Sequence, residues 1–204
     1  MFPILSFSHR SYALEATAAV LSDTCPYASD WPNCHISQET FSSFTRPLKD
    51  MSSYQAISFS PLVEATEIAQ YEAFSTSFWD SSGYGHLNIS ENIFARSAEG
   101  VRYEEVDTSS AKGKYDLLVP VFQISPLEAN KGAVLLNIYS ESNRATTIDY
   151  AIDTPPDSDL PTTGISEFIF LEQDDVKNPA SLVMYPIVPL HNTSTVGLAV
   201  GVLR

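Results

Sequence analysis

Apolar side chains recur at helical spacing near the start of the chain. Residues 9–21 contain neither glycine nor proline. Their apolar positions that share one stripe of a helix are Tyr12, Leu14, Ala16, Ala19 and Val20. This pattern predicts an amphipathic helix that ends near residues 22–23, before Pro26. The stretch that follows, to residue 49, is interrupted by three prolines and is expected to be a loop that carries short helical pieces.

A second helical pattern is clearer than the first. There is no glycine or proline from residue 62 to residue 79, and charged residues separate the apolar ones. The apolar side chains at helical spacing are Ile68, Tyr71, Phe74 and Phe78. We therefore expect a helix over residues 62–79, which the glycines in residues 81–85 end.

Strand patterns dominate the second half of the chain. Ahead of them, residues 54–60 alternate apolar and polar positions as a half-buried strand does, and Pro61 ends this strand. Further strands are expected over residues 115–124, 133–139, 165–171, 181–188 and 195–203. Segment 133–139 is nearly all apolar and is predicted to be central, whereas 143–151 favours a short helix and 153–161 a surface loop. Leading helices followed by a run of antiparallel strands are typical of an α+β fold and not of a doubly wound sheet.

Composition and net charge indicate whether the chain folds and which kinds of partner it can bind. The 204 residues are 44% hydrophobic, 11% aromatic and 18% charged, so the chain is expected to fold as one domain, or as a small domain with a helical stalk. Acidic residues outnumber Lys and Arg by 25 to 11, which gives a net charge of −14. A field of this sign repels phosphates, so nucleic-acid binding is not expected.

Two cysteines and two glycosylation sequons bear on the cellular compartment. Cys25 and Cys34 flank a Pro-rich turn, and the sequence fits either a local disulfide or two unpaired buried thiols. The sequons begin at Asn88 and Asn192, and both would accept a glycan in the secretory pathway. No apolar run has the length of a membrane span, and residues 1–5 are too short for a signal peptide. These patterns leave two hypotheses: a cytosolic chain, or one whose ends are incomplete.

The sequence contains no recognisable catalytic or metal-binding motif. The four histidines are scattered, and there is no nucleophile elbow, P-loop or dinucleotide fingerprint. Asp153, Asp157 and Asp159 resemble a calcium loop only in part, because the glycine and closing glutamate of an EF-hand are lacking. A solvated acidic loop is favoured there. We therefore predict no catalytic residue, no metal site and no cofactor.

Asn137 is the most informative polar residue, because it lies within the apolar segment 134–138. A buried amide without a partner costs about 1–3 kcal/mol, so this side chain is expected to form hydrogen bonds. The favoured partner is backbone or water. The alternative is a ligand in a pocket between the sheet and a helix.

Several phrases of the sequence, taken in order, resemble the extracellular regions of receptor-type nucleotide cyclases of marine microalgae, which are related to CHASE-type sensors. These phrases are Trp-Pro-Asn at 31–33 with Phe41, the segments 57–63, 70–75 and 118–126, the strand with Asn137, and segment 181–188 with the Val-Gly pair at 196–197. The chain departs from the pattern at Tyr71 and Phe122, where tryptophan is expected, and at Cys34, where an aliphatic residue is expected.

The resemblance implies a PAS-like fold, in which helices flank an antiparallel sheet and a long N-terminal stalk helix forms a homodimer. It implies an N-terminal helix with a Pro-punctuated connector over residues 1–50 and a sensor domain over residues 51–204. In such relatives a membrane span lies on each side of the module, and a cytoplasmic guanylate or adenylate cyclase, or a histidine kinase, follows. The chain would then be an extracellular sensor without these spans and without the catalytic domain, and not an enzyme in itself.

The resemblance also implies a mechanism. A small ligand would bind between the sheet and the covering helix, shift the population of two dimer arrangements and move the stalk. The expected ligand-binding residues are Phe59, Tyr115, Phe122, Asn137 and Tyr185. Asn137 would supply the hydrogen bond and the aromatic side chains the walls. The second hypothesis is an interaction or dimerisation module without a small-molecule ligand, and the third is an acidic secreted hydrolase.

Overall fold

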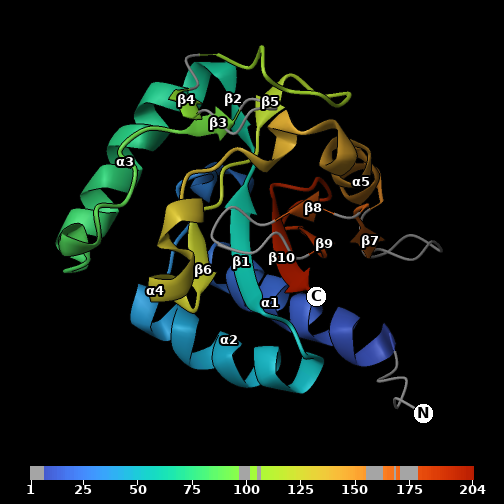
Figure 1. The fold of residues 1–204 in the computed structure, drawn as a ribbon. Helices are drawn as coiled ribbons and strands as arrows, with labels where there is room; N and C mark the ends of the chain where they lie inside the picture. Colours follow the sequence, from blue (N-terminus) through green and yellow to red (C-terminus); the bar gives the residue numbers. More distant parts are fainter. Residues whose placement is uncertain (1–6, 97–101, 105–106, 155–162, 168, 171–178) are drawn as a thin grey trace.

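The computed structural model describes residues 7–96, 102–104, 107–154, 163–167, 169–170 and 179–204, and shows helices around an antiparallel sheet (Figure 1). The α-helices are α1 (Phe7–Thr24), α2 (Gln38–Ser52), α3 (Ile68–Ser81), α4 (Leu127–Asn130) and α5 (Ser142–Asp153). The strands are β1 (Ala56–Pro61), β2 (Val63–Glu64), β3 (Phe94–Arg96), β4 (Arg102–Glu104), β5 (Leu117–Leu118), β6 (Gln123–Ser125), β7 (Gly164–Ile165), β8 (Ile169–Phe170), β9 (Pro179–Ile187) and β10 (Gly197–Leu203).

The main sheet has the strand order β6-β1-β10-β9-β7, and every neighbouring pair is antiparallel. Its longest pairing joins β9 to β10, from Ser181 opposite Leu203 to Ile187 opposite Gly197. Strand β8 adds to β9 outside this order. Helices that flank an antiparallel sheet confirm the predicted α+β class.

Helices α1 and α2 cover one face of the sheet. The strand registers place Phe59, Gly201 and Tyr185 on this face. At Gly201 a Cβ would lie 2.5 Å from the ring of Tyr54, so the glycine allows this ring to pack directly on β10. The Tyr54 hydroxyl in turn donates to the carbonyl of Arg10 in α1 at 3.1 Å. The first helix is thereby tied to the centre of the sheet.

The helix predicted over residues 9–21 is confirmed and continues to Thr24. It packs against α2, β9 and β10. The side chains that it buries are Ala13, Leu14, Thr17, Ala18, Leu21 and Ser22. Its opposite side leaves Tyr12, Ala19 and Val20 exposed. In the described residues, the exposed side of α1 combines these side chains with the charged Glu15 and Asp23, and of the predicted stripe only Leu14 is buried.

The other helices cover the rest of the sheet. α5 packs against β7 and β9, where the missing side chain of Gly164 leaves room for Thr147. α3 lies beyond the β6 edge and reaches the sheet through Phe122 (Figure 1). All six residues of β1 are buried, so the expectation of a half-buried strand is wrong: both faces are covered.

Helix α2 is the main element that the sequence did not predict. The chain was expected to be a loop with short helical pieces before residue 49, yet Gln38–Ser52 is one helix that includes Pro47. The Ser37 side chain caps its start by accepting a hydrogen bond from the amide of Thr40 at 3.1 Å. Pro47 has no amide hydrogen, so the carbonyl of Ser43 loses its usual helical hydrogen bond. Both residues are exposed. The proline is thus tolerated on the solvent side of the helix.

Segment 133–139 is not the predicted central strand. Leu135 has a φ of 65°, a left-handed conformation that a strand cannot contain. Within the part of the chain that the structure describes, this segment forms only isolated bridges, from Leu136 to Phe94 and from Asn137 to Pro120. The central positions of the sheet belong to β1, β10 and β9 instead.

The remaining predictions differ mainly at element boundaries. The helix expected over residues 62–79 begins only at Ile68, after β2 and a 3₁₀ turn. The strand expected over 115–124 is divided into β5 and β6. The helix at 143–151 and the strands at 181–188 and 195–203 are confirmed as α5, β9 and β10. Most of the loop at 153–161 and part of 165–171 lie outside the described residues.

Candidate functional site

A cluster of aromatic rings fills the space between α3 and the β6 edge of the sheet. Phe122 lies at its centre and is fully buried. Its ring centroid is 5.0 Å from that of Phe78, 5.5 Å from Phe74, 5.9 Å from Tyr71, 5.9 Å from Phe59 and 6.0 Å from Trp79. These distances are those of favourable edge and offset contacts between aromatic rings. The cluster therefore holds α3 against the sheet.

Two hydroxyl groups of α3 are buried beside this cluster. Tyr71 and Ser75 are one helical turn apart and fully buried, and their hydroxyls have no hydrogen-bond partner among the described residues. Burial raises the pKa of the Tyr71 phenol well above its usual value, so the group remains a neutral donor. A buried polar group without a partner costs about 1–3 kcal/mol, which makes this face of α3 a place where a polar ligand would be stabilised.

The structure brings some of the predicted ligand-binding residues together. Phe59 and Phe122 are in contact in the aromatic cluster. Tyr185 shares the face of Phe59 and lies two strands away, since both residues are opposite Ala199 of β10. Phe59 and Tyr185 thus share the face of the sheet that α1 and α2 cover, whereas Phe122 precedes β6 and packs against α3.

Asn137 is fully buried and forms hydrogen bonds with its own chain. Its Oδ1 accepts from the amides of Val119 at 3.0 Å and Tyr139 at 3.1 Å. Its Nδ2 donates to the hydroxyl of Ser110 at 3.2 Å. The favoured expectation, a backbone partner, is thus confirmed. The side chain joins three segments that are separate in the sequence.

Tyr115 lies at the edge of α5, and its polar contacts are not with the other predicted residues. Its hydroxyl forms a hydrogen bond with Asp153, which Lys114 also contacts at 3.0 Å. The hydrogen bonds from Tyr115 and Lys114 lower the pKa of the Asp153 carboxyl. The backbone amide of Tyr115 donates to the hydroxyl of Tyr139 at 3.0 Å, and that hydroxyl bonds to Asp149. The loop is therefore anchored to α5.

An open cleft of about 430 Å³, which we call the α3 cleft, was not predicted from the sequence. It lies between the second half of α3, residues 85–92 and β4, and its walls include Trp79, Asp80, Asn88, Glu91, Arg102 and Glu104. A second open hollow, of about 520 Å³, lies between α2 and α4. The sequence contains no motif for the α3 cleft, because its walls come from three segments that lie side by side only in the folded chain.

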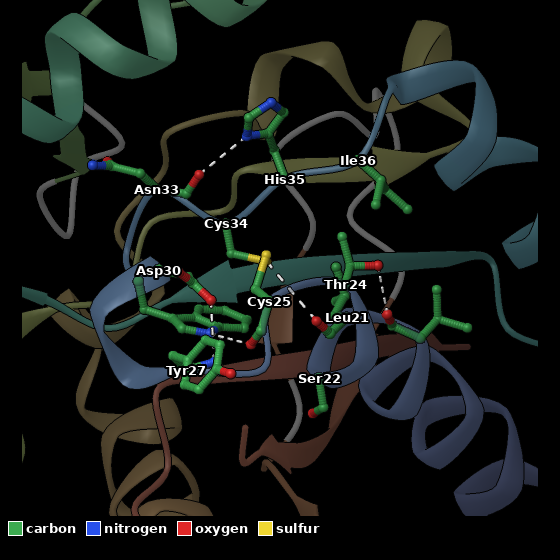
Figure 2. The surroundings of a disulfide bond; sticks show 12 residues. Leu21, Ser22, Thr24, Cys25, Tyr27, Asp30, Asn33, Cys34, His35 and Ile36 are labelled. Carbon is green, nitrogen blue, oxygen red and sulfur yellow. Dashed lines mark hydrogen bonds between the residues drawn. A yellow bond between two sulfur atoms is a disulfide. The ribbon is translucent and has the colours of Figure 1, made fainter. Parts of the chain in front are cut away.

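A disulfide joins the end of α1 to the segment before α2. Cys25 and Cys34 are bonded with an S–S distance of 2.13 Å, and both residues are buried (Figure 2). Trp31, within the bridged loop, donates from its indole nitrogen to the carbonyl of Cys25 at 3.2 Å. Of the two alternatives left open by the sequence, the disulfide is the one observed.

Removing this disulfide is expected to lower the free energy of unfolding by about 2–3 kcal/mol, because a cross-link over a short loop restricts the unfolded chain. In a protein of this size the double variant Cys25→Ala/Cys34→Ala would then melt about 5–10 °C below the wild type. Thermal unfolding followed by circular dichroism measures the difference. Wild-type protein treated with a reductant serves as control and should show a similar loss. Equal melting temperatures for variant and wild type would contradict the prediction.

The described part of the chain is an α+β module whose sheet carries a buried aromatic cluster and whose surface carries a polar cleft. A family model described as CHASE domain matches residues 34–204, so the chain belongs to the CHASE domain family. CHASE domains are extracellular sensor modules of signalling receptors, and they are sensory and not catalytic. A search of curated proteins finds no match to the chain. Within the described residues, no helix combines the length and the apolar character needed to cross a bilayer.

Proposed function

We propose that the chain is the ligand-sensing module of a transmembrane receptor that regulates a cytoplasmic guanylate or adenylate cyclase. The CHASE match over most of the chain carries this proposal. The disulfide supports an oxidising, extracellular location. The sequons at Asn88 and Asn192 are compatible with this location, because Asn88 is exposed and Asn192 is only partly buried. The proposed division into a connector over residues 1–50 and a sensor over 51–204 belongs to the same hypothesis.

The proposed ligand is a small molecule that binds near the aromatic cluster, with Phe59 and Phe122 as walls and Asn137, Tyr115 and Tyr185 as further contacts. The unpartnered hydroxyls of α3 support a site here, because a polar ligand group would supply the hydrogen bonds that the protein does not.

A continuous set of contacts leads from the cluster to α1. The ring of Phe122 contacts Phe59, and Phe59 makes an edge-to-face contact with Trp31 at 5.5 Å. The Trp31 indole then donates to the carbonyl of Cys25, directly after the end of α1. A ligand that favours one arrangement of α3 would therefore bias the position of α1.

We further propose that α1 forms a homodimer through its exposed side. Tyr12 and Val20, exposed at 56% and 38%, lie on this side with Ala16 and Ala19, and small residues allow close approach of a second helix. Ala19→Arg is expected to weaken the dimer at least about tenfold, because the interface would bury an unpaired charge. Sedimentation equilibrium of the chain measures the change. Ser43→Arg, on the exposed side of α2, is the matched control and should leave the association unchanged. A wild-type chain that remains monomeric would contradict the proposal.

The receptor assignment is tested by sequencing full-length transcripts of this locus. We expect the extended reading frame to encode a membrane span on each side of the module and a cyclase catalytic domain after the second span. A kinase domain in that position would overturn the cyclase output and retain the receptor role. A reading frame that is limited to these 204 residues would overturn the receptor role itself.

The second candidate function is an interaction module without a small-molecule ligand. One observation favours it: the predicted pocket wall is occupied by the protein's own side chains, since five other rings surround Phe122. The function of the chain would then be to form the proposed homodimer through α1.

A further inference from the structure

The α3 cleft lies beside the second half of α3 and borders the aromatic cluster, with which it shares Trp79. Thr76 and Asp80 of α3 form one wall, and residues 88–92 with β4 form the other. In Figure 1, α3 runs along the left side of the molecule, and the segment that leads to β3 runs beside it. The residues proposed above for the sensor ligand are not among those that line this cleft.

Carboxylates dominate the charge of the cleft. Among the described residues, Asp80, Glu91 and Glu104 line it, against one cationic side chain, Arg102. Glu72 adds to the negative field from a neighbouring position, where its carboxylate accepts a hydrogen bond from the amide of Ile93 at 2.8 Å. Burial, opposed by this hydrogen bond and assisted by the charge of Glu104, raises the pKa of Glu72. The cleft thus has a surplus of negative charge that favours a cation.

Arg102 is held to one side of the cleft. Its guanidinium lies 3.9 Å from the centre of the Phe94 ring and donates to the hydroxyl of Ser90. Both contacts fix the orientation of the Arg102 side chain. A ligand therefore meets this cationic group in a fixed position at the wall of the cleft.

Trp79 is the second, independent indication of a ligand. Its indole forms part of the cleft wall and is only 3% exposed, yet its N–H has no hydrogen-bond partner among the described residues. An indole N–H can only donate, so its partner must be an acceptor. A bound molecule with an acceptor near the indole would satisfy this group.

A bare metal ion does not fit these observations. Among the described residues, no three His, Cys, Asp or Glu side chains lie close enough together to hold one. The carboxylates are instead spread along a cleft of about 430 Å³, which is large enough for an organic molecule. We propose that the α3 cleft binds a small organic ammonium compound that also carries a hydrogen-bond acceptor, with the ammonium group at Asp80 and Glu91 and the acceptor at the indole of Trp79.

Three probes of matched shape test this proposal by isothermal titration calorimetry. L-Leucinamide carries both an ammonium group and an amide acceptor, 4-methylpentanamide lacks the ammonium group, and 3-methylbutylamine lacks the amide. We expect saturable binding of L-leucinamide, about tenfold weaker binding without the ammonium group and about threefold weaker binding without the acceptor. The protein should come from a host that forms disulfides and does not N-glycosylate, because the sequon residue Asn88 lines the cleft.

Two variants assign the binding to the cleft. Asp80→Asn is expected to weaken L-leucinamide binding about tenfold, and Trp79→Phe about threefold. Asp23→Asn makes the same charge change on the exposed end of α1 and should leave the affinity unchanged. Thermal melts of each variant show whether it is folded. Failure of L-leucinamide to bind, or binding that neither cleft variant alters, would overturn the proposal. Because binding is measured on the chain itself, the result does not depend on the receptor or cyclase assignment.

Discussion

Replacing Phe122 with alanine is expected to lower the free energy of unfolding by about 3–5 kcal/mol, because the substitution leaves a large cavity in a packed interior. The ring is fully buried and contacts five other aromatic rings from α3 and the sheet. In a chain of about 200 residues this loss corresponds to a melting temperature lower by about 10 °C or more. Urea unfolding followed by tryptophan fluorescence is a suitable measurement, since Trp79 lies in the same cluster.

Leu190→Ala is the matched control for Phe122→Ala. Leu190 is 63% exposed, so its truncation is expected to change stability by no more than about 0.5 kcal/mol. Phe122→Leu keeps an apolar side chain in the cluster and should fall between the two. Equal stabilities of Phe122→Ala and Leu190→Ala would show that α3 is not held to the sheet by this ring.

Local periodicity explains which helices could be predicted from the sequence. Residues 9–21 were predicted to be a helix from apolar positions close together in the sequence. This helix and the short one expected over residues 143–151 are both observed. α2 was missed because Pro47 was interpreted as a helix breaker. Whether a proline is tolerated depends on which side of the helix faces solvent, and that is decided by tertiary packing.

The same limit applies to strands. Segment 133–139 is apolar enough to be a central strand, but its burial comes from the loops and bridges around it and not from pairing in the sheet. The left-handed φ of Leu135 has no signal in the sequence, because such conformations are rare outside glycine, asparagine and aspartate. The apolar composition therefore predicted the burial correctly and the secondary structure wrongly.

The candidate sites show a further difference between residue type and position. The sequence predicted that Asn137 is buried and needs hydrogen bonds, because its amide lies within an apolar segment. Its partners Val119 and Ser110 could not be predicted, because they are 18 and 27 residues away. The α3 cleft was missed for a related reason: its walls are adjacent only after α3, residues 85–92 and β4 have folded together.

Replacing Asn137 with leucine is expected to lower the free energy of unfolding by about 2–6 kcal/mol, since two buried backbone amides would lose their acceptor at about 1–3 kcal/mol each. These amides belong to Val119 and Tyr139. Ser110→Ala removes an acceptor of the Asn137 amide nitrogen and leaves the Oδ1 contacts in place, and it should cost about 1 kcal/mol.

Hydrogen exchange and ligand binding, measured together, distinguish the two roles considered for Asn137. If the side chain is a structural link, Asn137→Leu will remove protection at the amides of Val119 and Tyr139, and stability will fall while the affinity of the folded protein for an identified sensor ligand stays the same. If Asn137 instead contacts the ligand, the affinity will fall beyond what the loss of stability explains. Its three hydrogen bonds within the chain favour the first outcome. In that case Asn137 would act on the proposed pocket only by fixing the segment that carries Phe122, through the neighbouring bonds between Val121 and residues 135–136.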